Sequence, residues 1–172
     1  MSFEELDHTA DYLFRCRGRS PEELFSESAR AMFSIMFENN DAKNVGNNGT
    51  DSDSNSGSKN SSNSSNNGSN ADSDAVRVKK EIEVESDSLS NLLIDFLSEL
   101  LFVAEVDCLV LSGVKPKITG NSLKAEVFGE PFVPEKHGGG TEIKGISRSG
   151  VEIEKISDVG GIYYQAEIIF DV

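Results

Sequence analysis

The sequence has few cysteines, and this scarcity excludes two kinds of stabilised fold. Its two cysteines, Cys16 and Cys108, are too few for a disulfide framework and do not have the C-x-x-C spacing of a metal-binding pair. Both lie in apolar patterns typical of strands. We therefore expect both side chains to be buried as small hydrophobic groups.

Long apolar runs are also absent. No stretch approaches the ~20 apolar residues that a membrane-spanning helix needs, so we expect no membrane association. The first residues lack the basic region followed by an apolar region that marks a secretion signal. We therefore expect a cytoplasmic protein.

Positive charge is scarce. The chain has 16 Lys and Arg against 30 Asp and Glu, a formal net charge of −14 and a pI of about 4.5. Nucleic-acid-binding proteins usually present a basic face that neutralises phosphates, and the sequence shows none. We expect no direct binding to RNA or DNA, and a protein partner or a cation is favoured. The acidity is equally consistent with a surface suited to a salt-rich cytosol.

Residues from about 41 to 75 are almost entirely Asn, Ser, Gly and Asp. This stretch has too little apolar surface to offset the entropy of ordering it. We expect a disordered insert within one domain that spans residues 1–172. A pattern like a calcium-binding loop begins at Asp51, but Ser56 and Ser62 occupy the positions that need Gly and Glu, so we attribute it to composition.

Hydrophobic periodicity predicts two helices. The first follows Ser20, which is suited to cap it, with Pro21 in the first position and Glu23 completing a capping box; it should end near Asn39. The second lies within residues 86–105 and is the more apolar. The expected core face of the first helix consists of Leu24, Phe25, Ala29, Met32, Phe33 and Met36.

Alternating apolar residues predict about seven strands. They lie at residues 3–7, 12–17 and 76–85, in two strands around a turn at Gly120 and Asn121, and in two or three strands within 141–172 that are interrupted at Gly160 and Gly161. Many of these strands follow one another as hairpins. The fold class is therefore predicted to be α+β, with a mostly antiparallel β-sheet or sheets covered by two amphipathic helices.

Two polar stretches are candidates for function. In "LDHTADYLF", His8 stands beside aspartates, but no Ser or Cys nucleophile has a suitable setting, so we expect no catalytic residue and no cofactor-binding residue. In "EKHGGGTEIKG", Lys136 and His137 precede three glycines. A strand pattern rather than a helix follows, which disfavours a phosphate-binding loop. A flexible connection and a contact loop for a partner both stay open.

Four blocks of sequence, in this order, resemble the archease family: "LDHTADYLFRCRGRSPEELFSESARAMFSIM", "SLSNLLIDFLSELLF", "EKHGGGTEIKGIS" and "IIFDV". The resemblance covers the chain apart from the insert. It implies a small accessory protein of the RtcB-type RNA ligase, which seals tRNA halves in tRNA splicing. Such a protein is not itself an enzyme. It promotes the GTP-dependent guanylylation of the ligase and its multiple turnover.

The resemblance also implies a metal site at Asp11, Asp171 and Val172, the last through its terminal carboxylate. If the first and last strands pair, these anionic groups converge. Two like charges ~4 Å apart repel by about 4 kcal/mol at an effective dielectric constant near 20, which favours binding of a cation. Oxygen ligands suit a hard divalent ion, so we expect Ca²⁺, with Mg²⁺ as an alternative.

Five further residues are candidates for a supporting role. His8 is expected to join the metal or to orient one of its carboxylates. Possible contacts with the site or with a partner are Lys136, His137, Glu142 and Lys144.

Two other functions stay open on the sequence alone. One is a general protein chaperone or scaffold with a structural metal. The other is a metal-dependent phosphoester hydrolase with Asp11 and Asp171 as ligands and His8 or His137 as the base. The acidic surface makes a phosphate substrate awkward for the hydrolase.

Overall fold

The computed structural model describes residues 2–7, 11–37 and 77–172. The predicted insert at about 41–75 lies outside the described residues, and so does His8. The described elements are, in chain order, β1 (Ser2–Leu6), β2 (Tyr12–Gly18), α1 (Pro21–Met36), β3 (Val78–Glu85), α2 (Leu89–Val106), β4 (Leu109–Thr119), β5 (Ser122–Pro131), α3 (Pro134–His137), β6 (Gly145–Ile146), β7 (Glu154–Asp158) and β8 (Gly161–Asp171).

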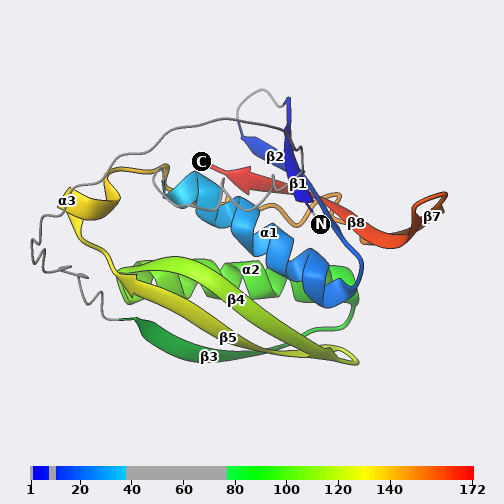
Figure 1. Cartoon of the computed structure of the whole chain (residues 1–172), viewed down its shortest axis with the longest axis horizontal. Helices are drawn as coiled ribbons and strands as arrows, with labels where there is room; N and C mark the ends of the chain where they lie inside the picture. Colours follow the sequence, from blue (N-terminus) through cyan, green and yellow to red (C-terminus); the bar gives the residue numbers. More distant parts are fainter. Residues whose placement is uncertain (1, 8–10, 38–76) are drawn as a thin grey trace, which may run out of the picture.

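Two long helices lie between two antiparallel sheets (Figure 1). The five-stranded sheet has the order β1-β2-β8-β6, with β7 also paired to β8, and the three-stranded sheet has the order β3-β5-β4. Helix α1 contacts β2 and β4, and α2 contacts β3 and β6, so each helix touches both sheets. The predicted α+β class is confirmed. In the described part of the chain, no helix combines the length and the apolar character needed to cross a bilayer.

The last strand, β8, pairs with β2 and not, as assumed from the sequence, with the first strand, β1. The register runs from Tyr12 opposite Phe170 to Gly18 opposite Tyr164. Alternate side chains point toward the helices, where Phe14 and Phe170 meet edge to face with ring centroids 6.1 Å apart. The remaining side chains form the outer face of this sheet, which the two helices do not cover.

Helix α1 begins as its sequence predicts. The Ser20 hydroxyl accepts a hydrogen bond from the Glu23 N–H at 3.2 Å, and Pro21 occupies the first turn. The Glu23 carboxylate accepts from the Arg19 N–H, one residue before the cap, so the reciprocal bond of a capping box is displaced. The helix ends at Met36, before the predicted end at Asn39, because Phe37 adopts an extended backbone.

The two cysteines have different environments. Cys16 is fully buried between β2 and the helices, as predicted. The prediction is wrong for Cys108, which is exposed. Cys108 follows the last residues of α2 with φ of 50°, a left-handed conformation that turns the chain out of the helix and into β4. In the sequence, Cys108 follows an apolar helix and looks like a core residue. In the structure, it lies in a turn at the surface.

Candidate metal centre

The paired part of β2 and β8 ends next to both expected aspartates. Tyr12 is the first residue of β2 and lies opposite Phe170, so Asp11 precedes the paired segment and Asp171 follows it at the same end. Asp11 itself lies in a bend just before β2. The register therefore brings the two acidic residues, which are far apart in the sequence, to the same end of the strand pair.

Asp171 belongs to the outer face of the five-stranded sheet. Phe170 points toward the helices, so Asp171, the next residue of β8, points away from them. Asp171 is half-buried, and so is Asp11 in the bend before β2. Among the residues that the structure describes, neither carboxylate has an ion-pair partner. Two half-buried like charges without a partner cation favour capture of a metal ion.

A cation nearby on this face is already neutralised. The Arg15 guanidinium donates to Glu167 at 2.6 and 2.9 Å across the β2–β8 pair, and it also reaches Glu4 of β1 at 3.2 Å. These bonds raise the pKa of Arg15, with the hydrogen bond to Glu167 as the largest cause. These bonds join β1, β2 and β8. They also neutralise the charge of Arg15, so that this charge does not offset the charges of the aspartates.

Strand β6 holds Asp171 from the other side. The Lys144 N–H donates to the Asp171 carbonyl oxygen at 2.8 Å, and Gly145 is the cross-strand partner of Asp171. A Cβ atom at Gly145 would lie 3.9 Å from the Asp171 Oδ2 atom, so the glycine leaves open space beside the carboxylate. Asp171 thus has a backbone held by β6 and a side chain with room for a ligand.

The oxygen groups near Asp171 suit a bound cation, but side chains alone do not provide enough ligands for one. In residues 2–7, 11–37 and 77–172, no three His, Cys, Asp or Glu side chains gather around one point. The two aspartates provide carboxylate oxygens, and Val172, which packs against the core, would add its terminal carboxylate. Ca²⁺ takes 6–8 oxygen ligands and accepts water among them, so these groups fit part of its coordination shell.

The other candidate residues divide between two places. Lys136 and His137 both contact Glu130 of β5, with their nitrogens 2.6 and 2.9 Å from its two carboxylate oxygens. Lys144 touches Asp171 only through its backbone, and Glu142 is exposed. The structure therefore ties Lys136 and His137 to β5 rather than to the aspartates.

Glu130 is the residue that sequence reasoning missed. The hydrogen bond from Lys136, followed by that from His137, lowers the pKa of its carboxyl. In sequence it looks like an ordinary solvent-facing position of an alternating strand. The available signal was the turn between Pro131 and Pro134, which folds the following Lys and His back toward the end of β5.

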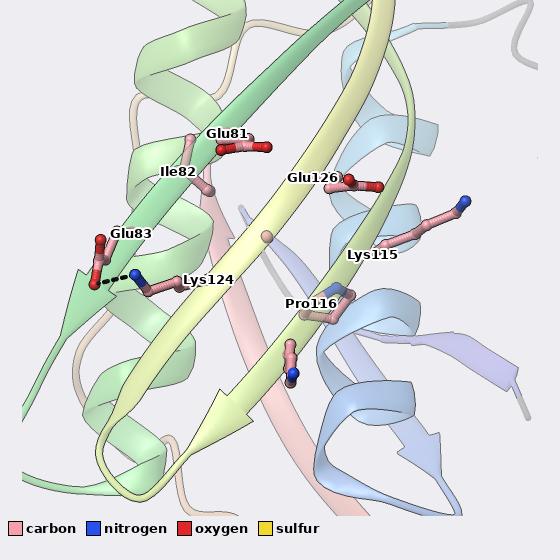
Figure 2. Close-up of a pocket in the computed structure, with 9 residues that line it drawn as sticks. Glu81, Ile82, Glu83, Lys115, Pro116, Lys124 and Glu126 are labelled. Carbon is pink, nitrogen blue, oxygen red and sulfur yellow. Dashed lines mark ion pairs between the residues drawn. The ribbon is translucent and has the colours of Figure 1, made fainter.

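A hollow of about 540 Å³ lies on the outer face of the three-stranded sheet (Figure 2). Six charged side chains line it, and Lys124 pairs there with Glu83 at 3.1 Å. Lys117 lies directly opposite Lys124 in the β4–β5 ladder, so two like charges are cross-strand neighbours. Of the candidate site residues that the structure describes, none lines this hollow, which belongs to the other sheet.

Sequence comparison relates the chain to one family over nearly its full length. The sequence profile of the Archease protein family matches residues 3–56 and 67–172. Protein archease of Methanosarcina mazei is 30% identical over 175 residues, covering 99% of this chain and 95% of the relative. The protein archease-like of Drosophila melanogaster is 31% identical, covering 100% of this chain and 91% of the relative.

Solved structures share the fold. The solution structure of Methanobacterium thermoautotrophicum protein 1598 aligns with a TM-score of 0.62 at 24% identity, covering 99% of this chain and 98% of that one. The crystal structure of a Thermotoga maritima archease, described as a possible chaperone, aligns with a TM-score of 0.54 at 18% identity and covers 98% of this chain and 96% of that one. At these identities, the likeness shows the fold alone.

Proposed function

Because the chain belongs to the archease family, we propose that it is an accessory protein that activates an RtcB-type RNA ligase in tRNA splicing. It promotes guanylylation of the ligase and multiple turnover, and it is not itself an enzyme. Its partner is the ligase protein, without direct contact to nucleic acid, and it acts in the cytoplasm. The proposal includes a divalent metal ion, Ca²⁺ or Mg²⁺, at Asp11, Asp171 and Val172.

The observation that supports this proposal is the β2–β8 register, which ends with Tyr12 opposite Phe170. Asp11 and Asp171 therefore lie at the same end of two neighbouring strands. Such a pair costs stability through repulsion unless a cation or a partner uses it. A functional role explains this arrangement better than a structural role does.

The protein's own residues would prepare the site. Asp11 and Asp171 would hold the ion, the Lys144 N–H fixes the Asp171 backbone, and Gly145 leaves room beside the carboxylate. When bound, the ion supplies a positive charge on a strongly acidic protein. That charge would allow this end of the sheet to attract an anionic group of the ligase or of its nucleotide.

Ligase guanylylation with GTP tests the proposal. We expect faster guanylylation with this protein than without it, and loss of the effect after metal removal. Asp11→Ala and Asp171→Ala should abolish activation while the fold survives, as circular dichroism would show. Glu85→Ala removes an exposed carboxylate at the end of β3, on the other sheet, and should activate like the unchanged protein. Full activation by both aspartate variants would remove the metal-site mechanism.

A general chaperone or scaffold is the second candidate, and exposed apolar side chains favour it. These large hydrophobic residues are Phe102, Val106, Phe132, Val133, Val159 and Ile162. Chaperones contact unfolded partners through such groups. Suppression of aggregation of unrelated proteins, without a special effect on the ligase, would support this function over ligase activation.

A further inference from the structure

One segment connects the two sheets and ends at the candidate metal site. We call residues 134–144 the strap. It follows β5 of the three-stranded sheet, begins with α3, and leads into β6 of the five-stranded sheet (Figure 1). Its path runs from the end of one sheet, past the end of α1, to the end of β8. The strap therefore links structure far from the aspartates to the backbone of Asp171.

His137 fastens the start of the strap. Its side chain is 8% exposed, and its ring stacks on Phe132 with centroids 5.8 Å apart. The Nδ1 atom accepts a hydrogen bond from the Val133 N–H at 2.9 Å, and Nε2 lies 2.9 Å from Glu130 Oε1. Because Nδ1 is an acceptor, the proton of the neutral ring is on Nε2, which donates to Glu130. Both ring nitrogens are thus used to hold the strap against β5.

The middle of the strap lies against the end of α1. A Cβ atom at Gly140 would stand 1.7 Å from the Met36 carbonyl oxygen, so only glycine permits this close approach. The Thr141 N–H donates to the Ile35 carbonyl oxygen at 3.1 Å. A helix leaves its last carbonyl groups without partners inside the helix, and here the strap provides one. The contact fixes the strap relative to α1.

The end of the strap reaches the candidate metal site. Ile143 is buried in the core at 1% exposure, and the next residue, Lys144, donates its N–H to Asp171. A series of hydrogen bonds and tight packing therefore extends from Glu130 through His137 and Thr141 to the Asp171 backbone. The first link of this series is the only one that depends on a histidine.

We infer that His137, held by Glu130, is a positioning residue that sets the strap and, through the strap, the backbone of Asp171. The link from Glu130 to Nε2 carries this role, because it is the less exposed of the two bonds that attach the strap to β5; the other is the exposed bond from the Lys136 ammonium to the same carboxylate. The effect on a metal ion rests on the proposed function. The effect on the strap itself does not, so the two are tested separately.

Amide hydrogen exchange tests the role of His137 without any metal. In His137→Asn, the side-chain oxygen takes the place of Nδ1, so the bond from Val133 is kept and the bond to Glu130 is lost. In His137→Gln, the amide nitrogen takes the place of Nε2, so the bond to Glu130 is kept. We expect exchange at the Thr141 and Lys144 amides to rise roughly tenfold or more in His137→Asn and to stay near the original rate in His137→Gln.

Two comparisons make the result decisive. The Leu97 N–H, in the middle of α2 where the side chain is fully buried, is an internal reference for global opening. Lys124→Met breaks a lysine–glutamate pair of the three-stranded sheet and should leave the strap unchanged. Unaltered exchange at Thr141 and Lys144 in His137→Asn, or an equal rise at Leu97, would overturn the inference.

Calcium titration by calorimetry then tests whether the strap affects the metal affinity of the site. We expect the Kd for Ca²⁺ to rise roughly tenfold or more in His137→Asn and to be preserved in His137→Gln. If Ca²⁺ and Mg²⁺ bind to none of the proteins while strap exchange responds as expected, the metal proposal fails and the positioning role stands. If Ca²⁺ binds equally to all of them, the coupling of His137 to the site is refuted.

Discussion

Tyr12 and Phe170 are cross-strand partners, so Asp11 and Asp171, the residues next to them in sequence, lie at the same end of the β2–β8 strand pair. We expect Ca²⁺ at 100 times its Kd to raise the free energy of unfolding by about 2.7 kcal/mol. Asp11→Asn and Asp171→Asn should lose this gain. Without metal, each variant should be slightly more stable than the original protein, because one of two repelling charges is gone. Urea unfolding with Ca²⁺ or with chelator measures both effects, and equal stabilisation of all three proteins would contradict the site.

The two thiols should differ in reactivity. Burial raises the pKa of Cys16 to about 12, so almost none of its reactive thiolate form exists near neutral pH. Cys108 is exposed at the end of α2. A colorimetric thiol reagent should modify one cysteine in the folded chain and both after denaturation. Cys108→Ser should leave no fast-reacting thiol, and rapid modification of that variant would show that Cys16 is accessible.

Acid should weaken the attachment of the strap. Hydrogen bonds from Lys136 and His137 hold the pKa of the Glu130 carboxyl below its ordinary value. A carboxyl with a lowered folded-state pKa stabilises the fold above its unfolded pKa, and this contribution disappears as pH falls through the lowered value. Below about pH 4.3, the free energy of unfolding should fall more steeply for the original protein than for Glu130→Gln. Parallel curves in urea unfolding at a series of pH values would contradict this.

The like-charged pair on the three-stranded sheet should respond to charge reversal. Lys117 and Lys124 are direct cross-strand partners on β4 and β5. Lys117→Glu converts repulsion into attraction and should raise the free energy of unfolding by about 0.2–1 kcal/mol. Lys117→Gln should give a smaller gain, and high salt should reduce both differences. Urea unfolding at low and high salt measures these differences. A loss of stability in Lys117→Glu would contradict the prediction, because it would show that Lys117 makes a favourable interaction in the hollow that outweighs its repulsion by Lys124.

Deletion of residues 44–74 should leave ligase activation unchanged. This stretch contributes almost no apolar residue, and shortening a connection changes the closure entropy only with the logarithm of its length. The guanylylation assay compares the deletion variant with the full chain. A large loss of activation would give the stretch a role that its composition does not reveal.

Local signals predicted the elements that form locally. Ser20 caps α1, and Gly120 with Asn121 separates β4 from β5, as the capping pattern and the turn residues predicted. Periodicity also predicted α2, although its cap, Ser88, was not named from the sequence. The end of α1 at Met36 was not predictable in this way. It coincides with a contact from the strap, which is distant in sequence. The short helix α3 was also missed, because it has a single turn and no apolar period.

The division into two sheets was beyond sequence reasoning for a similar reason. Alternation shows that a strand has one buried face, but it does not show which strands are its neighbours. The convergence of Asp11 and Asp171 was expected from a family resemblance and is supported by the β2–β8 register. Glu130 had no such resemblance to mark it, and only the fold of the following turn brings Lys136 and His137 to its carboxylate.

The position of β8 has a consequence for synthesis on the ribosome. This strand lies inside the five-stranded sheet, between β2 on one side and β6 and β7 on the other, yet it follows every other described element in the sequence. Until it emerges, a nascent chain cannot close that sheet, and the apolar surface of α1 lacks part of its cover on that side. Folding of the whole domain must therefore wait until β8 has emerged, and until then the partly folded chain exposes apolar surface that promotes aggregation.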